Sequence, residues 1–156
     1  MVGLGEAQSV FLVDESETLA YGESLSRDLR SGGTVFLHGD LGAGKTTLTR
    51  GILRGFGYDG PIRSPTYTLV ERYETDFLPV SHFDLYRMGD PGELEFLGVR
   101  DDIGPEKLCI VEWPERAQGW LGHRNLDIYI TFSTQPYENT KKIGRQIQLK
   151  WHNHHT

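Results

Sequence analysis

The feature that most constrains this chain is a glycine-rich octapeptide at residues 39–46, with the sequence Gly-Asp-Leu-Gly-Ala-Gly-Lys-Thr. The β-branched and apolar run at 34–37 before it predicts a buried strand, and residues 45–53 after it have apolar side chains at helical spacing. A strand, a glycine-rich loop ending in Gly-Lys-Thr and a helix together are typical of a P-loop, which binds nucleotide phosphates. The sequence therefore predicts a phosphate-binding loop at the carboxyl end of a strand.

The residue types of this loop fit a phosphate chain. Gly39, Gly42 and Gly44 allow backbone N–H groups to turn inward where a Cβ would collide. The helix N-terminus adds a partial positive charge, Lys45 adds a full charge toward the β- and γ-phosphates, and the Thr46 hydroxyl can bind Mg²⁺. We therefore expect ATP and Mg²⁺ as cofactors and Lys45 as a catalytic residue. The expected nucleotide-binding residues are Gly39, Asp40, Leu41, Gly42, Ala43, Gly44, Lys45, Thr46, Thr47 and Thr66.

Two carboxylates at predicted strand ends are candidates for hydrolytic chemistry. Asp84 follows the strand predicted over 80–83, and Glu112 follows the apolar run 108–111. Hydrolysis needs one acid to hold Mg²⁺, directly or through water, and a second acid can orient the attacking water. Composition does not settle the two roles, although the context of Glu112 is more typical of a Walker B acid, and either residue could instead be a helix cap or a surface carboxylate. The expected metal-binding residues are Thr46, Asp84 and Glu112, and Glu112 is also expected to be catalytic.

The tripeptide Ser64-Pro65-Thr66 lies between the predicted P-loop helix and the next predicted strand, at 67–73. Nucleotide switches often place a hydroxyl here that contacts the γ-phosphate or its metal, so Thr66 is the candidate sensor. An ordinary turn is the alternative interpretation of the same three residues.

The rest of the chain predicts an α/β fold with one P-loop NTPase domain. Asp14, with Glu17 three residues later, forms a capping-box pattern that opens a helix to about residue 29, and a second helix begins after Asp90. Further strands are predicted at 9–13, 34–37, 67–73, 80–83, 108–111, 126–132 and 143–151. The last two alternate in polarity as a half-exposed antiparallel pair does. We expect a mixed central sheet flanked by helices, with antiparallel strands toward the C-terminus.

The domain is expected to span residues 1–151, with 152–156 as a disordered tail. Three residues of this tail are His and could bind a stray metal ion, but no Cys or carboxylate accompanies them. His38 and His82, at predicted strand ends, are expected to be structural.

The composition of the chain indicates which binding partners and which cellular compartment to expect. Sixteen Lys and Arg against 22 Asp and Glu give a net charge of -6, so no general attraction for nucleic acid is expected. The single cysteine, Cys109, lies in an apolar run where a thiol behaves as a small core side chain. With no recognisable export signal or membrane span, we expect a cytoplasmic protein with no membrane partner.

Four motifs, in this order, resemble those of the TsaE family, also called YjeE. They are Gly-Asp-Leu-Gly-Ala-Gly-Lys-Thr-Thr at 39–47, Ser-Pro-Thr-Tyr-Thr-Leu at 64–69, Phe-Asp-Leu-Tyr-Arg at 83–87 and Val-Glu-Trp-Pro-Glu at 111–115. The similarity covers about residues 10–149. The family comprises bacterial ATPases required for threonylcarbamoyladenosine modification of tRNA.

The resemblance implies a role for each candidate residue. Lys45 and Thr46 would bind the phosphates and Mg²⁺, Asp84 would serve the metal as the Walker B acid, and Glu112 would be the acid needed for hydrolysis. Thr66 would belong to a switch-like segment near the γ-phosphate.

The resemblance also places other residues near the nucleotide. Trp113 would lie close to the active site, although its ring could equally pack in the core, and adenine would lie near the first strand and helix, by Thr18. The residues provide no evident charge clamp for the transition state, so slow turnover is expected unless Arg87 or a partner residue supplies one.

By the same resemblance, the partners are the TsaD and TsaB proteins, which transfer a threonylcarbamoyl group to adenosine 37 of tRNA, and this chain is not the transferase. Contact with tRNA is expected only indirectly or within that complex. A small-molecule kinase and a nucleotide-gated binding module are the alternatives, but no arginine-rich lid supports the kinase. The absence of an Asn-Lys-x-Asp motif argues against a GTPase.

Overall fold

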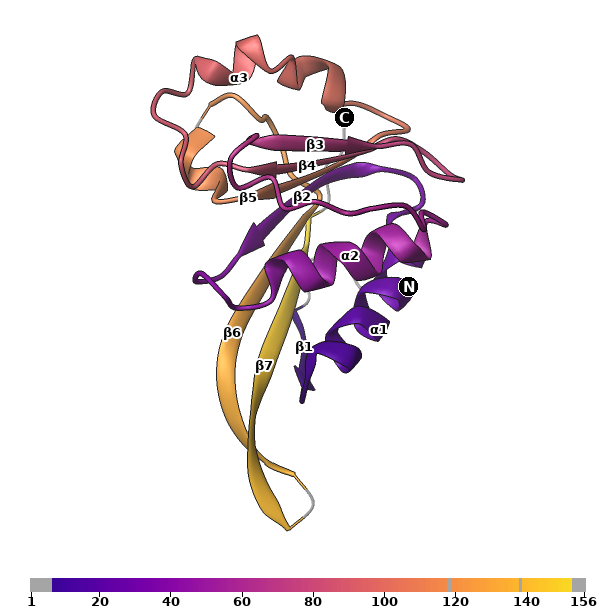
Figure 1. Ribbon diagram of the computed structural model, residues 1–156, viewed down its shortest axis with the longest axis vertical. Helices are drawn as coiled ribbons and strands as arrows, with labels where there is room; N and C mark the ends of the chain where they lie inside the picture. The colour runs from indigo at the N-terminus through magenta and orange to yellow at the C-terminus, as the bar shows by residue number, and fades with distance from the viewer. Residues whose placement is uncertain (1–6, 118, 138, 153–156) are drawn as a thin grey trace.

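The central sheet of the fold contains both parallel and antiparallel strand pairs, as the sequence predicts. The computed structural model describes residues 7–117, 119–137 and 139–152, and over them the strands lie in the order β1-β7-β6-β2-β5-β4-β3 (Figure 1). The strands are β1 (Ala7–Leu12), β2 (Gly33–His38), β3 (Val70–Tyr73), β4 (Val80–Asp84), β5 (Leu108–Glu112), β6 (Leu126–Tyr137) and β7 (Thr140–Trp151). The helices are α1 (Glu15–Leu25), α2 (Lys45–Gly55) and α3 (Glu93–Phe96), and the 3₁₀ turns are η1 (Ser26–Leu29), η2 (Val99–Asp102) and η3 (Pro114–Ala117). The predicted α/β class is confirmed.

The strand that precedes the glycine-rich loop lies in the middle of the sheet. β2 pairs in parallel with β5 and β6, and β4 pairs in parallel with β5. The pairs β1–β7, β6–β7 and β3–β4 are antiparallel, which confirms the predicted antiparallel strands near the C-terminus. Leu37 of β2 and Asp84 of β4 both pair with Glu112 of β5. Because parallel strands end at the same edge, the loop and both predicted acids lie together.

The predicted capping box opens the first helix. Asp14 Oδ1 accepts a hydrogen bond from the Glu17 N–H at 2.9 Å, and Glu17 Oε1 accepts one from the Val13 N–H at 2.8 Å. The first contact satisfies an N–H group that the first helical turn leaves without a partner, and the second ties the residue before the N-cap to the helix. The α-helix ends at Leu25 and continues as the 3₁₀ turn η1 to Leu29, so the predicted span holds with a tighter last turn.

Two predicted elements are shorter than expected. β3 begins at Val70 because Leu69 has φ 68° and donates its N–H to the Pro65 carbonyl at 2.8 Å, which makes a turn of the predicted strand's first residues. The helix predicted after Asp90 is the single turn α3, which is followed by Gly98 at φ 72°. Such a positive φ is compatible with Gly and ends the helix.

Apolar side chains form one cluster on each face of the sheet. α1 and α2 lie on one face, and α3 lies on the opposite side of the molecule (Figure 1). The cluster beneath α1 and α2 includes Leu37, Leu48, Ile52, Ile110, Ile128 and Ile147. The cluster on the other face includes Phe83, Leu85, Leu94, Cys109 and Val111. β6 and β7 form a long hairpin whose far half extends beyond the helices (Figure 1).

Three smaller expectations concern the core, the chain end and the membrane. Cys109 is fully buried, and this burial raises the pKa of its thiol, as fits a core side chain. His152, assigned to the predicted tail, donates its N–H to the Asn125 carbonyl at 2.9 Å, while residues 1–6 and 153–156 lie outside the described residues. Among the described helices, none has the length and apolar character needed to cross a lipid bilayer.

The two helices on the P-loop face touch backbone to backbone at a pair of glycines. A Cβ on Gly22 of α1 would lie 2.6 Å from the Leu48 carbonyl oxygen, and a Cβ on Gly51 of α2 would collide with the Leu19 carbonyl oxygen. Both glycines are buried. Glycine is therefore required on each helix for this close approach, which sets the position of α2.

We predict that Gly51→Ala destabilises the fold. Alanine favours an isolated helix by up to about 1 kcal/mol, but the collision with α1 backbone forces the helices apart, and such overpacking costs about 1–3 kcal/mol or more. The free energy of unfolding, measured in urea, should therefore fall. Gly89→Ala is the matched control, because a Cβ there would meet nothing closer than 3.8 Å. An equal or higher stability for Gly51→Ala would contradict the close helix contact.

Candidate functional site

The glycine-rich loop leaves β2 at His38 and enters α2 at Lys45. Gly42 and Gly44 have φ values of 80° and 111°, which side chains rarely adopt, and the Ala43 N–H donates to the Asp40 carbonyl at 3.1 Å. Gly39 is tightly packed, because a Cβ there would lie 2.8 Å from the Ile130 carbonyl oxygen. The loop conformation therefore depends on glycine at these positions, as the motif predicts.

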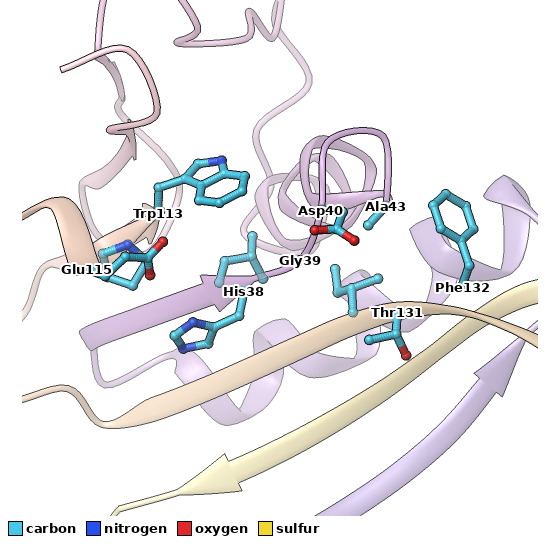
Figure 2. A pocket seen from close by; sticks show the side chains of 11 residues that line it. His38, Gly39, Asp40, Ala43, Trp113, Glu115, Thr131 and Phe132 are labelled. Atoms are coloured by element: carbon cyan, nitrogen blue, oxygen red, sulfur yellow. The ribbon is translucent and has the colours of Figure 1, made fainter.

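Most of the predicted site residues line one open cavity of about 290 Å³. The residues that line it are Leu41, Gly42, Gly44, Lys45, Thr46, Thr47, Ser64, Thr66, Asp84, Glu112 and Arg145. Gly39, Asp40 and Ala43 instead line a neighbouring cavity of about 410 Å³ on the other side of the loop. Figure 2 shows this second cavity, with Trp113 and Glu115 on one side, Phe132 on the other, and the loop between them. The structure thus brings the predicted phosphate, metal and switch residues together.

Lys45 is held at the loop by groups of the protein itself. Its side chain is only 5% exposed, and its Nζ donates a hydrogen bond to the Gly39 carbonyl. The same Nζ lies 3.8 Å from Glu112 Oε1 and 4.3 Å from the centre of the Trp113 ring. Burial lowers the pKa of Lys45, while the carboxylates of Glu112 and Asp84 oppose that shift. A poorly solvated ammonium in an open cavity is a strong attractor for an anion such as phosphate.

Asp84 and Glu112 face the same cavity from neighbouring strands. Burial raises the pKa of Asp84, opposed by a hydrogen bond from the Tyr86 N–H, and the nearby Glu112 carboxylate raises it further. Two close carboxylates are stabilised when a cation lies between or beside them. With the Thr46 hydroxyl they form a set of hard oxygen donors that suits Mg²⁺.

No group of three His, Cys, Asp or Glu side chains in the described part of the chain is arranged to hold a metal ion alone. Mg²⁺ commonly takes one or two carboxylates and completes its coordination with water and substrate phosphates. Asp84, Glu112 and the Thr46 hydroxyl supply oxygen donors of that kind at the cavity.

Sequence reasoning missed the contact between His82 and Glu112. His82 Nε2 lies 2.6 Å from Glu112 Oε2, and both side chains are almost fully buried. His82 was expected to be structural, and the structure places it directly against the predicted catalytic acid. A signal was present in the sequence, because His82 and Asp84 are two residues apart on a strand and therefore share a face.

The predicted switch tripeptide lies at the edge of the cavity. Ser64 Oγ and Thr66 Oγ1 are 2.6 Å apart, and both residues line the cavity opposite the loop. Thr66 is therefore within the site, and it begins a turn at 66–68 that follows Ser64 and Pro65.

Trp113 combines both of the expectations for it. Its ring packs against Tyr86, with ring centres 4.9 Å apart, and also covers the Lys45 ammonium. Its φ of 56° is unusual for a residue other than Gly, and its buried Nε1 has no hydrogen-bond partner in the described part of the chain. Strain and an unsatisfied polar group are commonly found at functional sites.

The structure does not favour the suggestions for two individual residues. Thr18 is fully buried, and its hydroxyl donates to the Asp14 carbonyl, so it is not exposed for contact with adenine. Arg87 is exposed and lies over the Tyr67 ring at 4.9 Å, and it is not among the residues that line the cavity. The arginine that does line the cavity is Arg145 of β7, whose Nε donates to the Ala43 carbonyl at 2.8 Å.

His38 has the structural role expected of it. Its Nε2 lies 2.8 Å from Asp127 Oδ1, and His152 Nε2 and Arg124 Nε lie 2.6 and 2.9 Å from Asp127 Oδ2. Although burial opposes the shift, these three partners lower the pKa of Asp127. The cluster joins β2, β6 and the residue after β7 beside the second cavity.

Known proteins resemble this chain over most of its length. The model of the family "Threonylcarbamoyl adenosine biosynthesis protein TsaE" matches residues 12–147. The chain is 42% identical over 143 residues to the tRNA threonylcarbamoyladenosine biosynthesis protein TsaE of Haemophilus influenzae, and the match covers 88% of each chain. It is 37% identical over 118 residues to that of Bacillus subtilis, covering 76% of this chain and 73% of the relative.

A solved structure has the same fold. The crystal structure of YdiB from Bacillus subtilis superposes with a TM-score of 0.66 at 26% identity, and the match covers 97% of this chain and 90% of that one. On the family match and the identities together, this chain belongs to the TsaE family.

Proposed function

We propose that this chain binds ATP with Mg²⁺ and hydrolyses it slowly, as a cytoplasmic component of the machinery that makes threonylcarbamoyladenosine at position 37 of tRNA. It would act with the TsaD and TsaB proteins and would not itself be the transferase. The observation that carries the proposal is the convergence of Lys45, Thr46, Asp84 and Glu112 on one cavity at the glycine-rich loop.

In the proposed reaction, the chain's own residues bind the phosphates and manage one proton. Lys45 and the N–H groups of the loop bind the phosphates, and Thr46 and Asp84 bind the metal. Bound Mg²⁺ would neutralise negative charge on the phosphates. Glu112 orients the attacking water and accepts its proton, while the water oxygen bonds to the γ-phosphorus and the bond from that phosphorus to the bridging oxygen breaks, so that ADP leaves. His82 holds Oε2 of that acid, which leaves Oε1 on the side of Lys45.

A nucleotide-gated binding module is a second candidate function, because the contacts of Lys45 favour it. In the structure Lys45 is bound to Gly39, Glu112 and Trp113, and a nucleotide phosphate would have to replace some of these contacts. Nucleotide binding would then change the position of the strained Trp113 and the surface around it. In this version, ATP binding alters a docking surface and hydrolysis is incidental.

The family role also accounts for the acidic chain. A net charge of -6 disfavours independent binding to tRNA phosphates, so partners would supply the tRNA contact. We expect tRNA binding by the isolated chain to be weak and to vanish with added salt.

Substitutions in the cavity should separate binding from hydrolysis. Lys45→Ala should weaken ATP binding and abolish Mg²⁺-dependent hydrolysis, because it removes the charge that contacts the phosphates. Glu112→Gln should retain ATP binding and lower the hydrolysis rate by about 100-fold or more, since it removes the proton acceptor. Phosphate release and calorimetric titration with ATP measure the two effects. Glu23→Gln, which changes an exposed acid of α1 away from both cavities, is the control. Hydrolysis that survives both cavity substitutions would exclude the proposal.

The partners should raise the hydrolysis rate. We expect TsaD, TsaB and tRNA together to stimulate ATP hydrolysis by the wild type and not by Lys45→Ala or Glu112→Gln, because these partners are expected to complete the site. The same mixture tests the gate, since full formation of threonylcarbamoyladenosine with Glu112→Gln would favour gating over catalysis. Partners that change neither hydrolysis nor modification would count against the family role for this chain.

Removal of the His82 side chain should affect catalysis more than binding. His82→Leu should lower kcat by about 10- to 100-fold, because a small misplacement of a catalytic group has that effect, while the Kd for ATP stays nearly constant. His82→Gln places an amide nitrogen near the lost Nε2 and should restore part of the rate. A rate and pH profile for His82→Leu equal to those of the wild type would show that the contact does not position Glu112.

A further inference from the structure

Arg145 is a second cation in the cavity, and it lies outside all four sequence motifs. It lies on β7, one hundred residues from Lys45 in the sequence. Pairing of β7 with β6 and β1 places Arg145 opposite Phe132 and Leu12. Of the described residues that line the cavity, only Lys45 and Arg145 carry a positive charge.

The Arg145 guanidinium is fixed against the loop on one edge and open on the other. Its Nε donates to the Ala43 carbonyl at 2.8 Å, and its carbon lies 5.5 Å from the centre of the Phe132 ring. A Cβ on Gly44 would lie 2.8 Å from the same Nε, so the loop needs glycine there to let the arginine approach. The terminal nitrogens make no hydrogen bond within the described part of the chain. A planar, oriented group with free donors is suited to bind phosphate.

The strand order separates Arg145 from the hydrolytic residues. β5 and β4, which carry Glu112 and Asp84, lie on one side of β2, and β6 and β7 lie on the other. Arg145 therefore meets the loop at Ala43 and Gly44, beside the N-terminus of α2. Backbone N–H groups of a P-loop hold the α- and β-phosphates, and its lysine reaches the β- and γ-phosphates.

We infer that Arg145 is a phosphate-binding residue for the α- and β-phosphates of the nucleotide, and that it acts in binding rather than as an arginine that stabilises hydrolysis of the γ-phosphate. The inference rests on the proposed function, because it requires a nucleotide in this cavity. It assigns Arg145 to ATP and ADP alike, since both nucleotides carry these phosphates.

The test is calorimetric titration of the full chain with Mg-ATP and with Mg-ADP. For Arg145→Gln, the Kd for both nucleotides should rise by about tenfold or more, the loss expected for a charge-assisted hydrogen bond. The lost contact would be made equally in the ground state and in the transition state, so kcat at saturating ATP should change little. Arg145→Lys keeps the charge without the planar fork and should give an intermediate Kd. Arg27→Gln, which alters an exposed arginine of η1, is the matched control.

The results that would overturn the inference are distinguishable from one another. An unchanged Kd for ADP with a large fall in kcat would place Arg145 at the γ-phosphate. Unchanged Kd and kcat would leave Arg145 with a structural role only, and urea unfolding without nucleotide would measure that role. Failure of the wild type to bind either nucleotide would overturn the proposed function as well, whereas normal binding by the wild type and by Arg145→Gln would overturn this inference alone.

Discussion

The parallel pairing of β2, β5 and β4 is the constraint on which the rest of the site depends. It aligns Leu37, Glu112 and Asp84 in one row across three strands, so that the glycine-rich loop begins where both acids lie. Directly paired residues of neighbouring strands share a face, and alternation adds His82 to the face of Asp84. A shift of one residue in this register would turn the acids toward the opposite apolar cluster.

The site also depends on an electrostatic balance around Lys45. Burial of an ammonium is costly, and three groups compensate for it: the Gly39 carbonyl, the Glu112 carboxylate and the face of the Trp113 ring. Each of these contacts is weaker than a phosphate dianion would be as a partner in a poorly solvated site. The internal contacts therefore hold the lysine in position while still leaving a gain in free energy for an anionic ligand.

The close contact of α1 with α2 serves the same site at a distance. α2 begins at Lys45, and Gly22 and Gly51 fix how close this helix lies to α1. Because Leu48 and Ile52 on the same helix pack against the sheet, the helix N-terminus is held at the carboxyl end of β2. Stability of the helix pair and the geometry of the loop are thus set by the same few residues.

Short sequence patterns predicted the parts of the structure that depend on residues close together in the sequence. The glycine-rich loop, the capping box at Asp14 and the acids Asp84 and Glu112 each depend on a few neighbouring residues, and the structure places all of them as the patterns indicate. The contact of His82 with Glu112 and the approach of Arg145 to Ala43 depend on strand pairing between distant segments. The burial of Thr18, which the resemblance suggested lies near adenine, likewise depends on helix packing that a single segment does not reveal.

The position of Arg145 shows how precisely a long hairpin must be registered to contribute one side chain. β7 pairs with β6 on one side and with β1 on the other, so two ladders fix its register at Arg145. Gly144 reinforces this register, because a Cβ there would lie 2.7 Å from Cζ of Phe11 and would also collide with the Leu12 carbonyl oxygen. The Phe11 ring therefore lies over a position that only Gly fits. Since a slip of one residue would place Arg145 on the face away from α2, the packing of Phe11 on Gly144 and the contact of Arg145 with the loop support each other.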